Sequence, residues 1–434
     1  MIPAIIIFAL TYVLILSFPK YRPYIALASG ALFIITGLLP LGEVLGAIDY
    51  NVLLMIAGTM GLVTLFIESK MPSLLADLIM EKVPNVQWAA VCLALFAGVI
   101  SAFVDNVATV LMVAPVALEI CKKLNTNPVP FIIGIAVSSN LQGAATLVGD
   151  TTAIMLGSAL DMSFLDFIWY QGKPSIFFAV ELGAIISAAI LYIIFRKEKA
   201  PIPKMTERTK VTDYVPTILL GGAIVLLIVA SFIPWDLSIK NGLICCTLLV
   251  IGLIYNFFKK QDGEKELSTK EKLMEKVVGP LKTIDFETLG LLVGLFLMIG
   301  GISAQGVIAM LAQGLASVGG DNIFLLYTVI VWASVLISAF IDNIPYVATM
   351  IPVIAGLATE LGVDPTPLYF GLLSGATLGG NCTPVGASAN ITGIAILRKE
   401  GHEVKNSDFF KIGIPFTLAA IIPAYIYIWL VYGI

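Results

Sequence analysis

Charged residues are scarce in this sequence, and histidine is almost absent. Asp, Glu, Lys and Arg make up 12% of its 434 residues, and His402 is the single histidine. An average soluble domain is about 25% charged, so this composition argues against a water-soluble fold. The five cysteines form no CxxC pair. One histidine and unpaired cysteines argue against a His/Cys metal site, and we expect no resident metal.

Motifs of other protein classes are also missing. No GxxxxGK[ST] phosphate-binding loop occurs, so the chain shows no ATPase site of its own, although a separate ATPase subunit stays open as a partner. No basic region precedes the apolar run 2–18, and no small-residue cleavage site follows it. We therefore expect 2–18 to be a retained membrane span rather than a signal peptide. We expect no cofactor and no nucleic-acid partner.

Apolar residues, in contrast, are abundant. They make up 59% of the sequence, and the mean hydropathy is +0.98. A helix that crosses a bilayer needs about 20 apolar residues, and runs close to that length recur along almost the whole chain. This pattern predicts an all-α, polytopic integral membrane protein with the lipid bilayer as its partner. The clear spans are 2–18, 23–40, 51–67, 174–195, 216–233, 242–258, 286–303 and 412–432.

Further apolar regions are interrupted by polar residues. The regions 87–121 and 324–357 are each broken midway by an Asp-Asn pair. Irregular backbone at membrane depth is tolerated only when it is buried in protein or lines a water-filled cavity. We therefore predict that these two regions are re-entrant hairpins. The regions 130–160 and 367–397 are interrupted by glycine-rich polar stretches, and we predict that they are broken helices that still cross the membrane.

The distribution of Lys and Arg predicts an orientation, because cytoplasmic loops are enriched in these residues. With both hairpins re-entrant and the N-terminus outside, every Lys and Arg except Lys173 and Lys240 falls on the inside. Treating 87–121 as a full crossing spoils this bias. The sequence therefore predicts a protein of the cell membrane with its N- and C-termini outside.

The chain also repeats itself. The segment SAFVDNVATVLMVAPV at 101–116 matches SAFIDNIPYVATMIPV at 338–353 with an offset of 237, and AIDYNVL at 47–53 matches TIDFETL at 283–289. Each half would hold five crossings and one hairpin, and an odd number of crossings inserts the second half upside down. Inverted repeats with broken helices are a known transporter design. The predicted organisation is a first repeat at 1–200, a cytoplasmic linker at 201–215, and a second repeat at 216–434 with a solvated charged loop at 259–282.

Three aspartates interrupt the apolar regions. A carboxylate at the bilayer centre costs at least about 2.5–3.5 kcal/mol on insertion scales, so Asp105, Asp150 and Asp342 are unexpected as filler. At the hairpin tips, Asp105 and Asp342 could cap helix starts, could bind an ion, or could do both. The counterpart of Asp150 in the second half is Ala387. The shared fold therefore does not require the Asp150 carboxylate, and we predict a functional role for it.

Glycines and neutral polar groups surround these aspartates. Glycines let backbone groups approach a ligand, and half-helix ends present their dipoles to it. No Lys or Arg lies near either break in the sequence. This favours a proton, a transiently bound cation such as Na+, or a neutral polyhydroxyl species over a strongly charged anion. Glu181, midway along 174–195, is a further candidate proton site, or it simply bonds to a neighbouring helix. The candidate ion- or substrate-binding residues are Asp105, Asn106, Asn140, Gly143, Thr146, Gly149, Asp150, Thr151, Asp342, Asn343, Gly380, Asn381, Thr383, Gly386, Ser388 and Asn390.

The motifs at the breaks resemble those of the ion transporter superfamily. SAFVDNVATVLMVAP with SSNLQGAATLVGD, and SAFIDNIPYVATMIP with LGGNCTPVGASANITG, look most like its branch of arsenite permeases (ArsB), NhaD-type sodium/proton antiporters and P proteins. That branch is related to the citrate transporter-like divalent anion:sodium symporters. The resemblance covers essentially the whole chain. It implies a scaffold domain, a mobile transport domain with two hairpins, elevator-type motion and a homodimer.

Two departures from the family pattern bear on the substrate. Dicarboxylate carriers of the superfamily typically have Ser-Asn-Thr at their hairpin tips, where this chain has DNV at 105–107 and DNI at 342–344. This difference weakens a citrate or succinate interpretation. Members of the nearer branch often carry Gly-Asp-Pro-Pro-Asn after the first break. This chain has GDTTA at 149–153, which removes the first-half asparagine.

The leading hypothesis is a secondary active transporter of an inorganic ion or small oxyacid, coupled to protons or sodium. Arsenite, which is mostly neutral at pH 7, fits the predicted lining. A sodium/proton antiporter is the alternative, followed by a sodium-coupled di- or tricarboxylate carrier and a passive channel. An intramembrane aspartyl protease needs two carboxylates that share a proton, but it needs neither a second inverted copy nor paired hairpins. The sequence therefore predicts a transporter and no enzyme.

Overall fold

The computed structural model describes residues 1–202, 208–233, 237–259, 268–320 and 322–434, and these are mostly helical. The elements of the first half are α1 (Ile2–Ser17), α2 (Arg22–Ile35), α3 (Val44–Ala47), α4 (Tyr50–Glu68), α5 (Met71–Met80), α6 (Val86–Ser101), α7 (Asn106–Leu124), α8 (Val129–Gln142), α9 (Thr151–Ala159), β1 (Trp169–Tyr170), β2 (Lys173–Pro174) and α10 (Ile176–Ile194). Those of the second half are α11 (Val215–Ser231), α12 (Lys240–Phe258), α13 (Thr269–Leu273), α14 (Gly279–Leu281), α15 (Phe286–Ala304), α16 (Val307–Gly319), α17 (Ile323–Ser338), α18 (Asn343–Leu361), α19 (Thr366–Gly379), α20 (Ser388–Lys399) and α21 (Asn406–Tyr432).

Most long apolar helices fall on predicted crossings. Within the described ranges, six helices are long and apolar enough to cross a membrane: α4 with the turns before it, α10, α12, α15, α18 and α21. Helix α2 ends at Ile35, before the predicted end at 40, because the chain turns at Gly37 with a φ of +72°. A positive φ is readily adopted by glycine and ends the helix there. Helix α18 was predicted as one arm of a hairpin rather than as a crossing.

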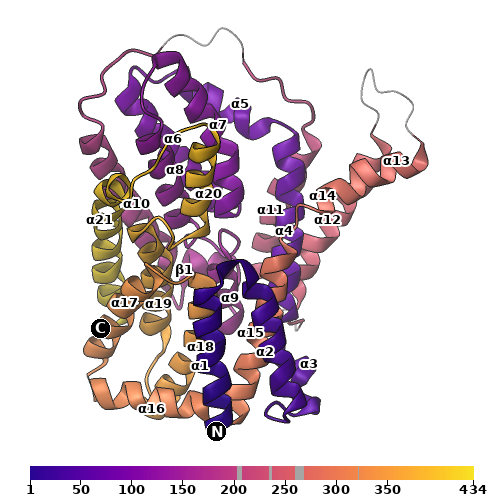
Figure 1. Cartoon of the computed structure of the whole chain (residues 1–434), viewed down its shortest axis with the longest axis vertical. Helices are drawn as coiled ribbons and strands as arrows, with labels where there is room; N and C mark the ends of the chain where they lie inside the picture. The colour runs from indigo at the N-terminus through magenta and orange to yellow at the C-terminus, as the bar shows by residue number, and fades with distance from the viewer. Residues whose placement is uncertain (203–207, 234–236, 260–267, 321) are drawn as a thin grey trace.

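The two predicted hairpins are pairs of helices. Helices α6 and α7 meet at residues 102–105, and α17 and α18 meet at residues 339–342. The tips therefore coincide with the Asp-Asn pairs. Figure 1 shows α6 and α7 toward the top of the molecule and α17 and α18 toward the bottom, so the hairpins approach the middle from opposite ends.

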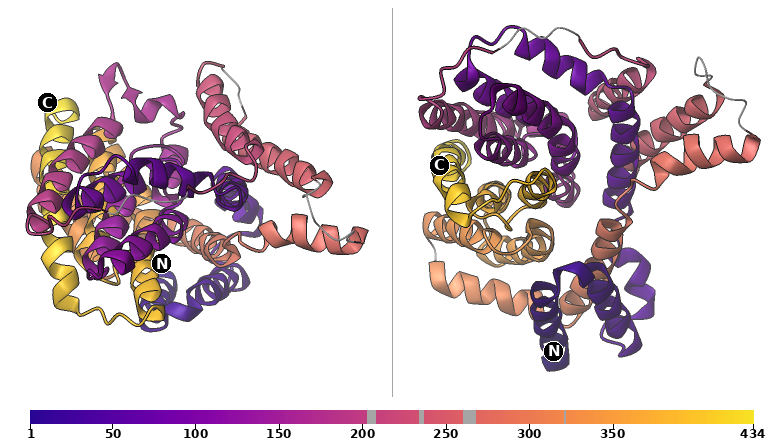
Figure 2. Two further views of the ribbon diagram at one scale, coloured as in Figure 1. Left: turned by 90° about the horizontal axis from the view of Figure 1, so that it is seen from above. Right: turned by 45° about the horizontal axis from the view of Figure 1, so that its top comes forward.

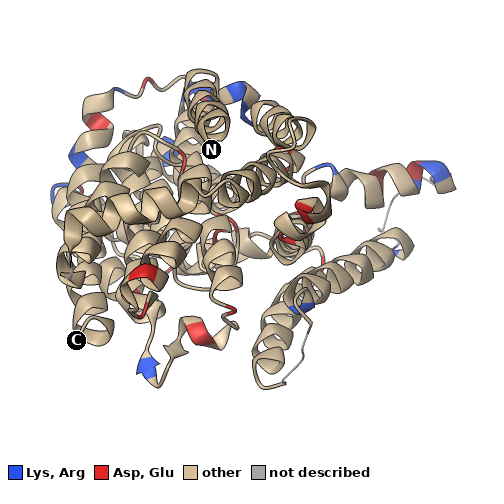
Figure 3. Cartoon of the chain, turned by 90° about the horizontal axis from the view of Figure 1, so that it is seen from below, with Lys and Arg blue, Asp and Glu red and all other residues tan. Residues whose placement is uncertain are grey.

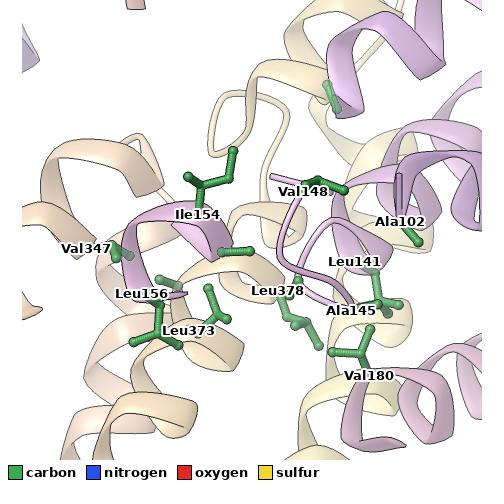
Figure 4. Packing of buried hydrophobic residues seen from close by; sticks show 14 of the residues in the cluster. Ala102, Leu141, Ala145, Val148, Ile154, Leu156, Val180, Val347, Leu373 and Leu378 are labelled. Atoms are coloured by element: carbon green, nitrogen blue, oxygen red, sulfur yellow. The ribbon is translucent and has the colours of Figure 1, made fainter. Parts of the chain in front are cut away.

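The two predicted helix breaks are also present. Residues 143–150 separate α8 from α9, and residues 380–387 separate α19 from α20. Apolar side chains pack around the first break, where Leu141 and Val148 lie in the same cluster as Leu378 from the second half (Figure 4). The first break is therefore buried in protein, as irregular backbone at membrane depth requires, whereas Val385 in the second break is exposed.

The helices are arranged around the two breaks. Helix α10 packs on α21, α6 on α8, and α17 on α19, and together they form one body. Helices α2 and α15 form a second packed pair, and α4 and α12 a third, on the other side of the molecule (Figure 2). Most Lys and Arg lie at the periphery, whereas several Asp and Glu lie between the helices (Figure 3).

Some elements were not predicted. The short helices α5 and α16 lead into the two hairpins. They are too short to meet a 20-residue criterion, and each buries one apolar face, which includes Met80 on α5 and Ile308 on α16. The charged loop predicted at 259–282 is helical at α13 and α14, and its residues 260–267 lie outside the described part. Strands β1 and β2 form a two-residue antiparallel pair before α10.

Candidate ion-binding cavity

Asp150 begins the second half of the first broken helix. Its Oδ1 accepts a hydrogen bond from the backbone N of Thr151 at 2.8 Å, and its Oδ2 accepts one from Thr152 Oγ1 at 2.7 Å. Asn343, at the tip of the second hairpin, donates through Nδ2 to the same Oδ2 at 3.3 Å. The residue is 6% exposed. Asp150 therefore caps α9 and joins a residue of the second half to the first break.

The second break forms without a carboxylate. Ala387 occupies the position that corresponds to Asp150, with φ −139° and ψ 145° against −146° and 153° at Asp150. No side chain caps α20 there. The same backbone conformation is thus reached with and without the acid, so the Asp150 charge is available for another role.

Threonines and glycines pin each break to a hairpin tip. Thr146 Oγ1 donates to the carbonyl oxygen of Ala102, and Thr383 Oγ1 donates to that of Ala339. A Cβ at Gly149 or at Gly386 would lie 2.6 Å from a carbonyl oxygen, of Gly143 and Gly380 respectively, so no larger residue fits. These predicted binding residues support the shape of the breaks: Gly143, Thr146, Gly149, Gly380, Thr383 and Gly386.

A buried amide network joins the two breaks. Asn140 Nδ2 donates to Asn381 Oδ1 at 3.1 Å and to the carbonyl oxygen of Thr377 at 2.7 Å. Asn140 Oδ1 accepts from Asn106 Nδ2 at 3.0 Å. Asn390 Nδ2 donates to two carbonyl oxygens of the second break. Asn140 and Asn381 therefore join the two breaks through their amides, whereas Asn390 engages its Nδ2 and leaves its buried Oδ1 without a partner among the described residues.

A cavity of about 430 Å³ lies beside the first hairpin tip. Both halves of the chain line it, and part of its lining was predicted from the sequence. The predicted residues at the cavity are Asp105, Asn106, Asp150, Thr151, Asn343 and Ser388. Carboxylate, amide and hydroxyl oxygens are suited to hard cations such as Na+, and carboxylates can also carry protons.

The remaining polar lining comes from α4 and the start of α15, which the sequence did not indicate as a site. Glu68 is the last residue of α4, and Asp285 caps α15 by accepting from the backbone N of Thr288 at 2.9 Å. Asp285 lies in the repeated TIDFETL segment, a signal that could have found it, whereas Glu68 had none. The carboxylates of Glu68 and Asp285 thus line the cavity together with those of Asp105 and Asp150. None of the described lining residues is Lys, Arg or His.

The second hairpin tip differs from the first. Arg22 Nη1 lies 2.9 Å from Asp342 Oδ2. The expectation that no Lys or Arg lies near either break is therefore wrong at this tip, because α2 brings an arginine from 320 positions away. Asp342 does not line the cavity. No ion pair to Asp105 is present among the described residues.

Glu181 lies apart from the cavity. It is half-buried on α10, close to the side chain of Gln142 at the end of α8, and it is not among the cavity-lining residues. In the described part of the chain, no group of three or more His, Cys, Asp or Glu side chains is arranged to hold a metal ion.

Comparisons with known proteins identify relatives among membrane transporters. A family model described as "Citrate transporter" matches residues 12–375 and 267–434. An uncharacterized transporter of Mycobacterium tuberculosis (strain H37Rv) is 30% identical over 449 residues, covering 99% of this chain and 98% of that relative. The P protein of Homo sapiens is 26% identical over 454 residues, covering 89% of this chain and 54% of that protein. The crystal structure of the Alcanivorax borkumensis YdaH transporter covers 94% of this chain and 90% of that chain, with a TM-score of 0.59 and 13% identity, a likeness of fold.

Proposed function

This chain belongs to the citrate transporter family of membrane transporters, within the ion transporter superfamily, and we propose that it exchanges sodium ions for protons across the membrane. It is a polytopic transporter rather than an enzyme. The exchange would take place at the cavity beside the first hairpin tip, where Asp105 and Asp150 bind either Na+ or H+.

The charge of the cavity lining carries this proposal. Glu68, Asp105, Asp150 and Asp285 face one space of about 430 Å³, and the described lining has no basic side chain. Carboxylates that face one partly dehydrated space repel each other. A cation or a proton relieves this repulsion, and the two compete for the same carboxylates. Competition for one site is the basis of exchange.

A neutral oxyacid such as arsenite is the second candidate substrate. Asn106, Thr151, Asn343 and Ser388 give the same cavity amide and hydroxyl groups that can bind a polyhydroxyl molecule. In that case the carboxylates would hold only the coupling ion. Citrate is disfavoured as a free anion, because its three negative charges would meet the acidic lining.

The test is transport by the full chain in proteoliposomes that contain a pH-sensitive dye. With an imposed pH gradient, we expect added NaCl, but not choline chloride, to release protons, and we expect an outward-directed proton gradient to drive ²²Na+ into the liposomes. Asp150→Asn liposomes of equal protein content are the matched control. Proton release at the same rate with and without sodium would overturn sodium/proton exchange. Uptake of arsenite, phosphate and citrate in the same liposomes would then identify the substrate.

A further inference from the structure

The two hairpin tips are alike in their local structure. Asp105 Oδ1 accepts from the backbone N of Val107 at 3.0 Å, and Asp342 Oδ1 accepts from the backbone N of Ile344 at 3.1 Å. Each aspartate thereby caps a helix of 19 residues, α7 or α18. The caps use one carboxylate oxygen at each tip. The surroundings of the other oxygen decide what else the aspartate does.

At the second tip, the other oxygen faces an arginine. Arg22 Nη1 donates to Asp342 Oδ2 at 2.9 Å, and the two side chains are 20% and 11% exposed. Ser388 Oγ lies 3.5 Å from the same oxygen. On the same side of the molecule, the Tyr12 hydroxyl of α1 donates to the carbonyl oxygen of Pro345 at 2.7 Å. Helix α1 and the start of α2 thus hold the second tip, through a neutral hydrogen bond and a charged one respectively.

At the first tip, helix packing supplies no arginine. Helix α2 packs on α15 in the same way that α12 packs on α4. Ala26 makes the close contact with α15 in the first pair, and Cys245 makes the corresponding contact with α4 in the second. This alignment makes Asn241 the counterpart of Arg22. Asn241 is neutral, and it lies with the neighbouring Lys240 at a different cavity from the one beside Asp105, so neither residue lines the cavity at the first tip. The two tips therefore share a fold and differ in one fixed positive charge.

We propose that the Arg22 guanidinium is the permanent counter-cation of Asp342, so that the transported cation has one site, at Asp105 and Asp150. This inference rests on the proposed cation transport. Arginine stays protonated in proteins, so its positive charge stays beside the carboxylate. A bound sodium ion or proton, in contrast, can dissociate. A second sodium ion at Asp342 would lie within a few ångströms of the guanidinium and be repelled. The asymmetry thus sets the number of ions that the two-fold repeated site can bind.

The experiment counts ²²Na+ ions bound per purified full-length chain at saturation, at alkaline pH. Wild type and Arg22→Lys should each bind one ion. Arg22→Gln, which frees Asp342, should bind two. The double variant Arg22→Gln/Asp342→Asn should bind one again, because it removes both charges and Asn can still cap α18.

The outcomes separate this inference from the proposed function. Two ions in wild type, one ion in folded Arg22→Gln, or fewer than one in the double variant would each overturn the inference and leave cation transport standing. If Arg22→Gln does not fold, the double variant still decides, since it leaves no unpaired charge. Absence of sodium binding in wild type would instead overturn the proposed function together with the inference.

Discussion

Asp150 combines a structural contact with a position at the cavity. Its carboxylate caps α9 and receives hydrogen bonds from Thr151, Thr152 and Asn343. The second break reaches the same backbone conformation with Ala387 in this place. The cap therefore adds to stability without being essential to the fold, and the negative charge is what distinguishes the two breaks.

We expect Asp150→Asn to reduce coupled transport at least tenfold while the protein stays folded in the membrane. The amide keeps an oxygen that can accept from Thr151, but it can no longer be protonated or neutralise a cation. Initial rates in proteoliposomes and thermal unfolding in detergent would measure the two effects separately. Full coupled flux in this variant over a range of pH would contradict a functional role for the charge.

A second residue-scale prediction concerns Asp285, which the sequence did not indicate as a site. Asp285→Asn should weaken cation binding by roughly threefold to tenfold, or about 0.7–1.4 kcal/mol, because one negative charge leaves the cavity. Asp49→Asn is the matched control. Asp49 caps α4 as Asp285 caps α15, accepting from the backbone N of Val52 at 3.0 Å, but it lies outside this cavity. Equal loss of affinity in both variants would point to damage to the caps rather than to electrostatics.

At the scale of elements, the breaks depend on close backbone contacts. A Cβ at Gly149 would lie 2.6 Å from the carbonyl oxygen of Gly143 and 2.9 Å from that of Ser101. A Cβ at Gly386 would lie equally close to the carbonyl oxygen of Gly380. Backbone atoms cannot move aside as the end of a flexible side chain can. The breaks and the tips are therefore fixed to each other, and a change in one is expected to displace the other.

We expect Gly149→Ala and Gly386→Ala each to lower stability by about 1–3 kcal/mol, the range for overpacking, and to reduce transport. Gly221→Ala is the control, because nothing lies within 4 Å of a Cβ there and α11 would gain helix propensity of up to about 1 kcal/mol. Thermal unfolding of the three variants in one detergent would compare them. Unchanged stability at both breaks would show that the backbone can relax around the new methyl group.

At the scale of the whole molecule, the predicted inversion of the halves places the two ends of α12 on opposite, specified sides of the membrane. Lys270→Cys and Ser238→Cys, each in a cysteine-free background, lie at exposed positions on either side of α12. We expect a membrane-impermeant thiol reagent to label the first only from the cytoplasm and the second only from outside. The positive-inside bias supplies the reason. Labelling of Lys270→Cys from outside would remove the odd number of crossings on which the inversion depends.

Much of the fold was predictable from the sequence because the membrane restricts what a chain can do. Long apolar runs must form helices that satisfy their own backbone, so α4, α10, α12, α15 and α21 were expected. The Asp-Asn pairs and the glycine-rich stretches marked the hairpin tips and the broken helices for the same reason. Helices α5 and α16 escaped prediction, because short amphipathic helices do not depend on a spanning length.

The sequence by itself determined that polar residues interrupt four apolar regions, and which residues those are. Only the tertiary structure decided which of them face the cavity and which support it. Asp342 is paired with Arg22 across 320 positions, and Asp285 and Glu68 join Asp105 and Asp150 at one space. The neighbours of a hairpin tip come from helices packed against it, and the repeat in the sequence, although it includes Asp285, does not indicate which side chains reach a tip. The charge of the site is therefore a property of helix packing, whereas its backbone is a property of the repeated motif.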